Sequence, residues 1–333
     1  MKQILTSLAT CLALLATAPA VAQTACAGRN LITDLSGPDQ AALAAAVAKA
    51  PFPEGNHWRA EKGGAQIDLI GTFHLYDPRM DAPMQRLRPL IAKADRIYLE
   101  ATDAEIAALQ KAVASKPDLM FTAGPTLPER LSEPDWQALS TAMTARGIPA
   151  FLASKFRPWY VSVLLSMPPC AMSALGGAPT GLDSLIAAEA KALGKPTLPL
   201  EPFDTILKVF EQIGPDDQLD MIRAALPLAP RAEDMLATMT DSYFRESHRE
   251  IWEFGRLQSL ATPGADPAKA EKDMALMEDA LINSRNHAWM TVLRRDAPGL
   301  RLIVAVGAGH LSGDQGLLNL LKQDGWTLTR QGF

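Results

Sequence analysis

The sequence lacks the features that mark several large classes of protein. It carries 32 Lys and Arg residues against 37 Asp and Glu, a net charge of −5, and no cluster of basic residues with interleaved aromatic residues. This balance disfavours nucleic acid as a partner. The sequence also has no Walker loop, no dinucleotide fingerprint, no Gly-x-Ser-x-Gly elbow and no His-Glu-x-x-His pair. The commonest nucleotide-binding, serine-hydrolase and zinc-protease arrangements are therefore excluded.

Long apolar runs are also absent, apart from a short one at the N-terminus. Lys2 precedes the apolar residues 4–16, and the small-x-small sequence of residues 20–22 fits cleavage before Gln23. We therefore expect residues 1–22 to be a cleaved signal peptide, with a retained N-terminal anchor as the alternative. The apolar residues 159–165 are too few to span a bilayer, so no membrane span is expected in the mature chain. A periplasmic or secreted location follows.

Cysteine is scarce, with three residues in 333. Cys11 is removed with the predicted signal peptide, which leaves Cys26 and Cys170 as an even pair in an oxidising compartment. A disulfide between them is the favoured interpretation, and two unpaired thiols are the alternative. None of the three cysteines has the pattern of a catalytic nucleophile.

The remaining chain alternates between strand-like and helix-like patterns. Strands are predicted at 57–60, 65–70, 96–100, 197–200, 300–306 and 326–330, and the apolar run 149–153 also fits a strand. Helices are predicted at 83–94, 181–193 and 315–323, and along much of 204–294. These patterns predict an α/β (α+β) fold with a mixed β-sheet flanked by helices. Residues 23–333 would form it, with sheet-forming portions at about 50–105 and 195–333 and a large helical insertion at about 106–194.

Two copies of one short motif lie near opposite ends of the chain. Residues 71–74 (Gly-Thr-Phe-His) follow an apolar strand, and residues 307–310 (Gly-Ala-Gly-His) follow another. Each motif places a histidine just after a strand end, where α/β folds keep their ligand sites. If the two strands are neighbours, the histidines share one cleft. The alternative for each histidine is a helix cap or a bond to a turn carbonyl.

Further polar residues accompany the motifs. Glu100 and Glu201 each end a predicted strand, although Glu201 could equally be an exposed loop carboxylate. Arg285 lies on an apolar helix face, where a guanidinium needs a carboxylate, phosphate or carbonyl partner. It could orient Glu100, clamp a substrate oxyanion, or form an internal salt bridge without a catalytic part. Asn286, its neighbour, is a weaker candidate.

Taken together, these residues resemble the TraB/PrgY/GumN family. The resemblance rests on the two motifs, on the strand ending at Glu100, on residues 181–183 (Gly-Leu-Asp), on residues 200–201 and on residues 285–286, in order along the chain. The family is grouped with the Tiki proteins, described as metal-dependent proteases, and more distantly with erythromycin esterases and haem-binding ChaN proteins. The resemblance implies a mixed sheet whose two motif strands face one cleft. It also implies that His74 and His310 are the paired motif histidines.

The leading hypothesis is therefore an exported metal-dependent hydrolase, a peptidase or amidase acting on a peptide or small-molecule substrate. A divalent metal (Mn, Co, Zn or Fe) would lower the pKa of its bound water and polarise the scissile carbonyl. The expected catalytic residues are Glu100, Arg285, His74 and His310, of which His74, His310 and Glu100 would hold the metal. The expected substrate-binding residues are Gly71, Gly307, Gly309, Glu201 and Asn286.

Two alternatives stay open. The first is an esterase-like hydrolase without a metal, in which a histidine acts as general base. The second is a non-catalytic periplasmic protein that binds haem, a metal or another small ligand through a strand-end histidine.

Overall fold

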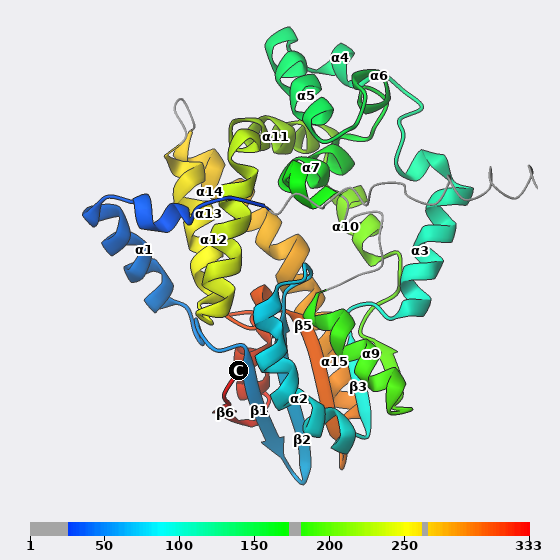
Figure 1. The fold of residues 1–333 in the computed structure, drawn as a ribbon, viewed down its shortest axis with the longest axis vertical. Coiled ribbons are helices and arrows are strands. Elements are labelled where there is room, and N and C mark those ends of the chain that lie inside the picture. The colour runs from blue at the N-terminus through cyan, green and yellow to red at the C-terminus, as the bar shows by residue number, and fades with distance from the viewer. Residues whose placement is uncertain (1–25, 173–180, 262–265) are drawn as a thin grey trace, which may run out of the picture.

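The computed structural model describes residues 26–172, 181–261 and 266–333, so the predicted signal peptide lies outside the described residues. Figure 1 shows a β-sheet with its helices at one end of the molecule and a group of helices at the other. Segment α1 (Gly37–Lys49) lies beside the helices α12 (Ala232–Phe244) and α13 (His248–Leu260).

One sheet of six strands organises the fold. Its strands are β1 (His57–Lys62), β2 (Ala65–Thr72), β3 (Arg96–Leu99), β4 (Thr197–Pro199), β5 (Arg301–Gly307) and β6 (Thr327–Arg330). They lie in the order β4-β3-β5-β2-β1-β6. The first four of that order are parallel, whereas β1 runs antiparallel to both β2 and β6. The predicted α/β fold with a mixed sheet is confirmed, and β1 and β2 form a hairpin.

Helices cover both faces of the sheet. Alternate residues of a strand point to opposite faces, and in the core Leu69 lies with α15 (Ser284–Asp296) and α16 (Leu317–Gln323). The next residue, Ile70, lies with α2 (Asp81–Lys93) and α9 (Leu182–Ala192). Burial of both faces explains why β5 reads as an unbroken apolar run, since a parallel strand covered on both sides has no solvent face.

The helical part has a hydrophobic core of its own. The helices of this part are α3 (Asp103–Ser115), α4 (Leu127–Arg130), α5 (Glu133–Ala145), α6 (Ala150–Ala153), α7 (Pro158–Ser166), α10 (Thr205–Gln212), α11 (Pro215–Ala225), α12, α13 and α14 (Pro267–Glu278). Leu139 of α5 and Leu164 of α7 share one cluster with Leu219 and Ile222 of α11. This part therefore draws on both the predicted insertion and residues 205–278, whereas α9, within the predicted insertion, packs on the sheet.

The predicted strand at 149–153 is wrong. Pro149 begins the short helix α6, and the amides of Leu152 and Ala153 both donate to its carbonyl. Ala153 is buried in the helical core, while Phe151 is 74% exposed. An apolar run of this length fits a helix turn as well as a strand.

A disulfide joins Cys26 to Cys170, with a Cα–Cα distance of 5.4 Å, as the sequence predicts. It connects the N-terminal segment to a residue within the predicted insertion. None of the described helices is long and apolar enough to cross a bilayer.

Candidate functional site at the strand ends

Four adjacent parallel strands bring the predicted polar residues to one edge of the sheet. In the order β4, β3, β5 and β2, these strands are followed by Glu201, Glu100, His310 and His74. Thr72 at the end of β2 pairs with Gly307 at the end of β5, so the two motifs leave the sheet side by side. Ligand sites of open α/β sheets occupy this carboxyl-end position.

The polar groups meet around Gly307. A Cβ atom on this glycine would lie 3.3 Å from Glu100 Oε1, 3.7 Å from His74 Nε2 and 3.7 Å from His310 Cδ2. Glu100 Oε1 accepts a hydrogen bond of 2.6 Å from the Gly307 amide. The missing side chain thus leaves a small space bordered by one carboxylate and two imidazoles.

Arg285 lies at the centre of this group and uses all of its donors there. A guanidinium has five N–H donors and no acceptor. Nε and Nη2 bind Glu201 at 3.0 and 2.7 Å, and Nη2 also binds Glu100 Oε2 at 2.6 Å. Nη1 donates to the Leu281 carbonyl at 3.0 Å and to His310 Nε2 at 3.2 Å. No donor is left over for a substrate oxyanion, so the geometry supports the orienting role for Arg285.

The helix that carries Arg285 is locally widened. A π-helical turn, η6 (Asp279–Asn283), directly precedes α15 and contains the Leu281 carbonyl that Arg285 contacts. Such π-turns occur often at functional sites because they shift the side chains that follow. On the next turn, the Trp289 ring lies 4.8 Å from the guanidinium and donates Nε1–H to Glu201 at 2.9 Å.

Asn286 fixes the tautomer of His310. Its amide nitrogen donates to the carbonyls of His310 and Gln315 at 3.1 and 2.8 Å. Its oxygen must therefore face His310 Nδ1, 2.7 Å away, and accept that proton. His310 then offers the lone pair of Nε2 toward Arg285 and the cleft. Burial, together with the charges of Arg285 and His74, lowers the pKa of His310 to about 3 against the attraction of Glu100, so the ring is neutral at pH 7.

His74 has the opposite electrostatic environment. Its Nδ1 lies 3.4 Å from Oδ1 of Asp183, in the first turn of α9. This partner, with a further contribution from Glu100, raises the pKa of His74 to about 9 against an opposing contribution from desolvation of the ring. Solvent reaches 64% of the side chain, which screens the pair and limits its effect on stability.

Glu100 is ionised over the whole physiological range. Burial of the carboxyl opposes ionisation, but His310, Arg285, His74 and the Gly307 amide together lower the pKa of Glu100 to about 2. A carboxylate with so low a pKa is a weak general base and a good cation ligand.

The other predicted substrate-binding residues are placed differently. Asn286 is fully buried behind His310 rather than in the cleft. Gly71 permits close packing, since a Cβ there would lie 2.9 Å from the Leu311 side chain. Gly309 is exposed, and a Cβ on it would meet its nearest neighbour at 3.9 Å. Glu201 faces Arg285 and Trp289 rather than open space.

The sequence interpretation did not assign Asp183 or Trp289 to the site. Asp183 lies at the start of a predicted helix, where an acidic residue is common for reasons of helix polarity alone. Gly181, two residues before Asp183, was the available signal, because a glycine before a helix can mark close contact with another segment.

The donor set partly fits a metal ion. His74 Nε2 and Glu100 Oε1 face the space at Gly307, and each ring has its Nδ1 held by a second residue, as is usual for metal-binding histidines. His310 Nε2 is instead bonded by Arg285 and lies 4.0 Å from Glu100 Oε1. Accordingly, no group of three or more His, Cys, Asp and Glu side chains in the described ranges has metal-site geometry as it stands.

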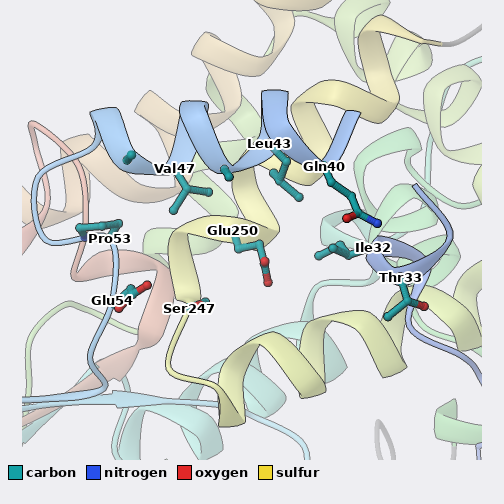
Figure 2. Close-up of a pocket in the computed structure, with 11 residues that line it drawn as sticks. Ile32, Thr33, Gln40, Leu43, Val47, Pro53, Glu54, Ser247 and Glu250 are labelled. Atoms are coloured by element: carbon teal, nitrogen blue, oxygen red, sulfur yellow. The ribbon is translucent and has the colours of Figure 1, made fainter. Parts of the chain in front are cut away.

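A separate pocket of about 680 Å³ lies between α1 and α13, away from the motifs. Figure 2 shows Leu43 and Val47 on one side of it and Glu250 on another. Glu250 is already bonded by Ser242 at 2.6 Å and by Arg245. This pocket contains none of the predicted site residues.

Comparisons with known proteins show the family to which the chain belongs. The model of the TraB/PrgY/gumN family matches residues 56–330, a range that includes every strand and all the residues around Gly307. The protein YbaP of Escherichia coli is 26% identical over 260 residues, which cover 78% of this chain and 89% of YbaP. YbaP of Shigella flexneri matches with the same identity and coverage. The chain belongs to the TraB/PrgY/gumN family.

Proposed function

We propose that this protein is an exported hydrolase that cleaves a peptide or amide bond with the help of a divalent metal held by His74, His310 and Glu100. The observation that carries the proposal is the meeting of these three side chains around Gly307, with both histidines anchored through Nδ1. The ion would be Mn, Co, Zn or Fe, since imidazole and carboxylate together suit these metals. When bound, it would supply an activated water and polarise the scissile carbonyl.

The protein's own residues prepare the site in distinct ways. Asp183 and Asn286 hold the two imidazole rings from behind. Arg285, anchored by Glu201, holds one oxygen of Glu100 while the Gly307 amide holds the other. His310 Nε2 could serve as a metal ligand only if it gave up its hydrogen bond from Arg285. The absence of a side chain at Gly307 keeps the space between Glu100, His74 and His310 free of a Cβ atom.

The disulfide supports export. A bond between Cys26 and Cys170 persists in an oxidising compartment and is rare in the cytosol. This agrees with the predicted signal peptide and favours the periplasm as the place of action.

The test uses protein exported to the periplasm and purified without a nickel column. We expect near-stoichiometric Mn, Co, Zn or Fe by elemental analysis, and cleavage of members of a peptide and amide library that a chelator abolishes. His74→Ala, His310→Ala and Glu100→Gln should each lose metal and activity. His287→Ala, a change at an exposed histidine on α15, is the matched control. Below about 0.1 metal per chain, with chelator-resistant hydrolysis, the metal mechanism would be wrong.

A second candidate is hydrolysis without a metal, in which His74 acts as general base once it has lost the proton that its raised pKa of about 9 keeps on the ring near neutral pH. The Asp183–His74 pair favours it, because a carboxylate behind an imidazole is the usual support of a histidine base. In that case activity survives the chelator and is lost in His74→Ala. A haem absorption shift lost in that variant, with no turnover of any library member, would instead indicate a binding protein.

A further inference from the structure

Asp183 lies directly against the Nδ1 side of the His74 ring. Its Oδ1 is inaccessible to solvent and makes no hydrogen bond within the described ranges, and its ion-pair partner is His74 Nδ1 at 3.4 Å. A buried carboxylate oxygen is costly unless a partner compensates it. The proximity of His74 Nδ1 is therefore the feature that can explain why this oxygen is buried.

The backbone just before Asp183 lies in close contact with the first motif. A Cβ on Gly181 would lie 2.2 Å from the Phe73 carbonyl oxygen and 2.5 Å from His74 Cα, so glycine alone fits there. The amide of Leu182 donates to that same Phe73 carbonyl at 3.0 Å. The start of α9 is thereby fixed to the turn that carries His74, and Asp183 is held beside the ring.

The second motif contains a matching arrangement with different chemistry. There the Nδ1 partner of His310 is the neutral amide of Asn286, at 2.7 Å. Both rings thus border the space at Gly307, His74 through Nε2 and His310 through Cδ2, while a side chain from another element lies against each Nδ1. The two histidines differ in that an acid supports the first and an amide supports the second.

We propose that Asp183 is the positioning residue of His74: its carboxylate accepts the Nδ1 proton and so directs Nε2 toward Glu100 and Gly307. In a neutral imidazole, the partner of one ring nitrogen sets which nitrogen carries the proton. The proposal rests on the proposed function for the use that is made of Nε2. The orientation of the ring can be measured independently of any activity.

The experiment compares Asp183→Ala, Asp183→Asn and the control Glu189→Gln in the full exported chain. Glu189 lies on the same helix and pairs with exposed Arg88 at 3.2 Å, away from the site. The chain has five histidines, so ¹⁵N-labelling of histidine gives few imidazole signals, and His74→Ala identifies the signals of His74. In parallel, calorimetric titration with Zn²⁺ alone measures metal affinity, and circular dichroism confirms that each variant is folded.

We expect Asp183→Ala to remove the Nδ1–H signature of His74 and leave that of His310 unchanged, with Zn²⁺ affinity about 10- to 100-fold lower. Asp183→Asn keeps an acceptor oxygen and should largely restore the signature, and Glu189→Gln should match the wild type. An unchanged His74 spectrum in folded Asp183→Ala would overturn the proposal. If wild-type protein binds no Zn²⁺ and hydrolyses nothing while the His74 signature still depends on Asp183, the proposed function fails and the positioning role stands.

Discussion

At the residue scale, the site shows how one motif yields two different histidines. Both follow a glycine at the end of a parallel strand, yet the pKa of His74 is raised to about 9 and that of His310 is lowered to about 3. The difference comes from residues outside the motifs, because His74 faces a carboxylate and His310 is buried beside Arg285. Near neutral pH the site therefore combines a protonated imidazole, a neutral imidazole and an ionised carboxylate.

Arg285→Lys tests whether Arg285 positions Glu100 or contacts substrate. Lysine keeps the charge but cannot bridge Glu201, Glu100 and His310 at once. We expect kcat to fall about 10- to 100-fold with a much smaller change in KM, as for other residues that orient ligands. Arg294→Lys on the same helix, an exposed residue paired with Asp324 at 2.9 Å, should leave both constants unchanged. A raised KM with unchanged kcat would instead place Arg285 against the substrate.

His248, which is not one of the site residues, should make the stability of the protein depend on pH. Burial lowers the pKa of His248 to about 4, and its Nε2 makes no hydrogen bond in the described part of the chain. Between pH ~6.5 and ~4, His248 is protonated in the unfolded chain but stays neutral in the folded protein. Stability therefore falls as the pH drops through this window, by about 2–3 kcal/mol for this group.

Urea unfolding of His248→Gln at several pH values measures this contribution. Glutamine can keep the hydrogen bond to Asn56 Oδ1 but does not titrate. The variant should lose part of the pH dependence between pH ~4 and ~6.5, whereas the exposed His287→Gln should keep it. An identical pH profile in wild type and His248→Gln would show that His248 does not contribute.

At the element scale, the sequence predicts the strands better than their order. Periodicity locates β1, β2, β3, β4, β5 and β6 to within a few residues, because alternating or continuous apolar runs between glycine turns are local signals. Nothing local states that β5 lies between β3 and β2, yet this order brings Glu100, His310 and His74 together. The partnership of Asp183 with His74 was missed for the same reason, since it depends on how α9 packs rather than on its sequence.

Gly181→Ala should disrupt the contact between α9 and the first motif. The added Cβ would lie 2.2 Å from a backbone oxygen, a clash that no side-chain rotation relieves. We expect a loss of ~1–3 kcal/mol or more in the free energy of unfolding, by the cost typical of overpacking. Activity should fall as well, because Asp183 moves with the helix start.

Gly255→Ala is the matched control for that substitution. Gly255 lies within α13, and a Cβ there would have nothing within 4 Å. It should stabilise the protein by about 0.5–1 kcal/mol, since glycine weakens a helix interior. If Gly181→Ala were equally harmless in urea unfolding and in activity, the close approach of α9 to His74 would be wrong.

At the scale of the whole molecule, the sheet carries the site and the helical part has a separate core. The strand ends supply both motif histidines and both glutamates, whereas Leu139, Leu164 and Ile222 belong to a cluster without a motif residue. The sequence predicted a helical insertion, but not that residues 205–278 would complete it. Helix α7, from the predicted insertion, packs against α11, from the later segment. The sequence does not indicate this contact, because the apolar face of either helix could have packed on the sheet instead.

The disulfide should therefore contribute stability without contributing to the site. Cys26 and Cys170 lie 144 residues apart in sequence, so their bond removes much conformational freedom from the unfolded chain. A loop of this length corresponds to a stabilisation of about 2–5 kcal/mol in the chain-entropy view. Neither cysteine lies on a strand that carries a site residue, so the ends of β2, β3, β4 and β5 should keep their arrangement without it.

Cys26→Ser/Cys170→Ser, compared with the wild type in the presence and absence of reductant, measures that contribution. Oxidised wild type should unfold at a higher urea concentration than the double variant, and reduced wild type should match the variant. The double variant should be insensitive to reductant and should retain its kcat below its unfolding transition. If reductant left wild-type stability unchanged, the pair would not be joined in the exported protein. A large loss of kcat in the still-folded variant would show instead that the N-terminal tether helps to shape the cleft.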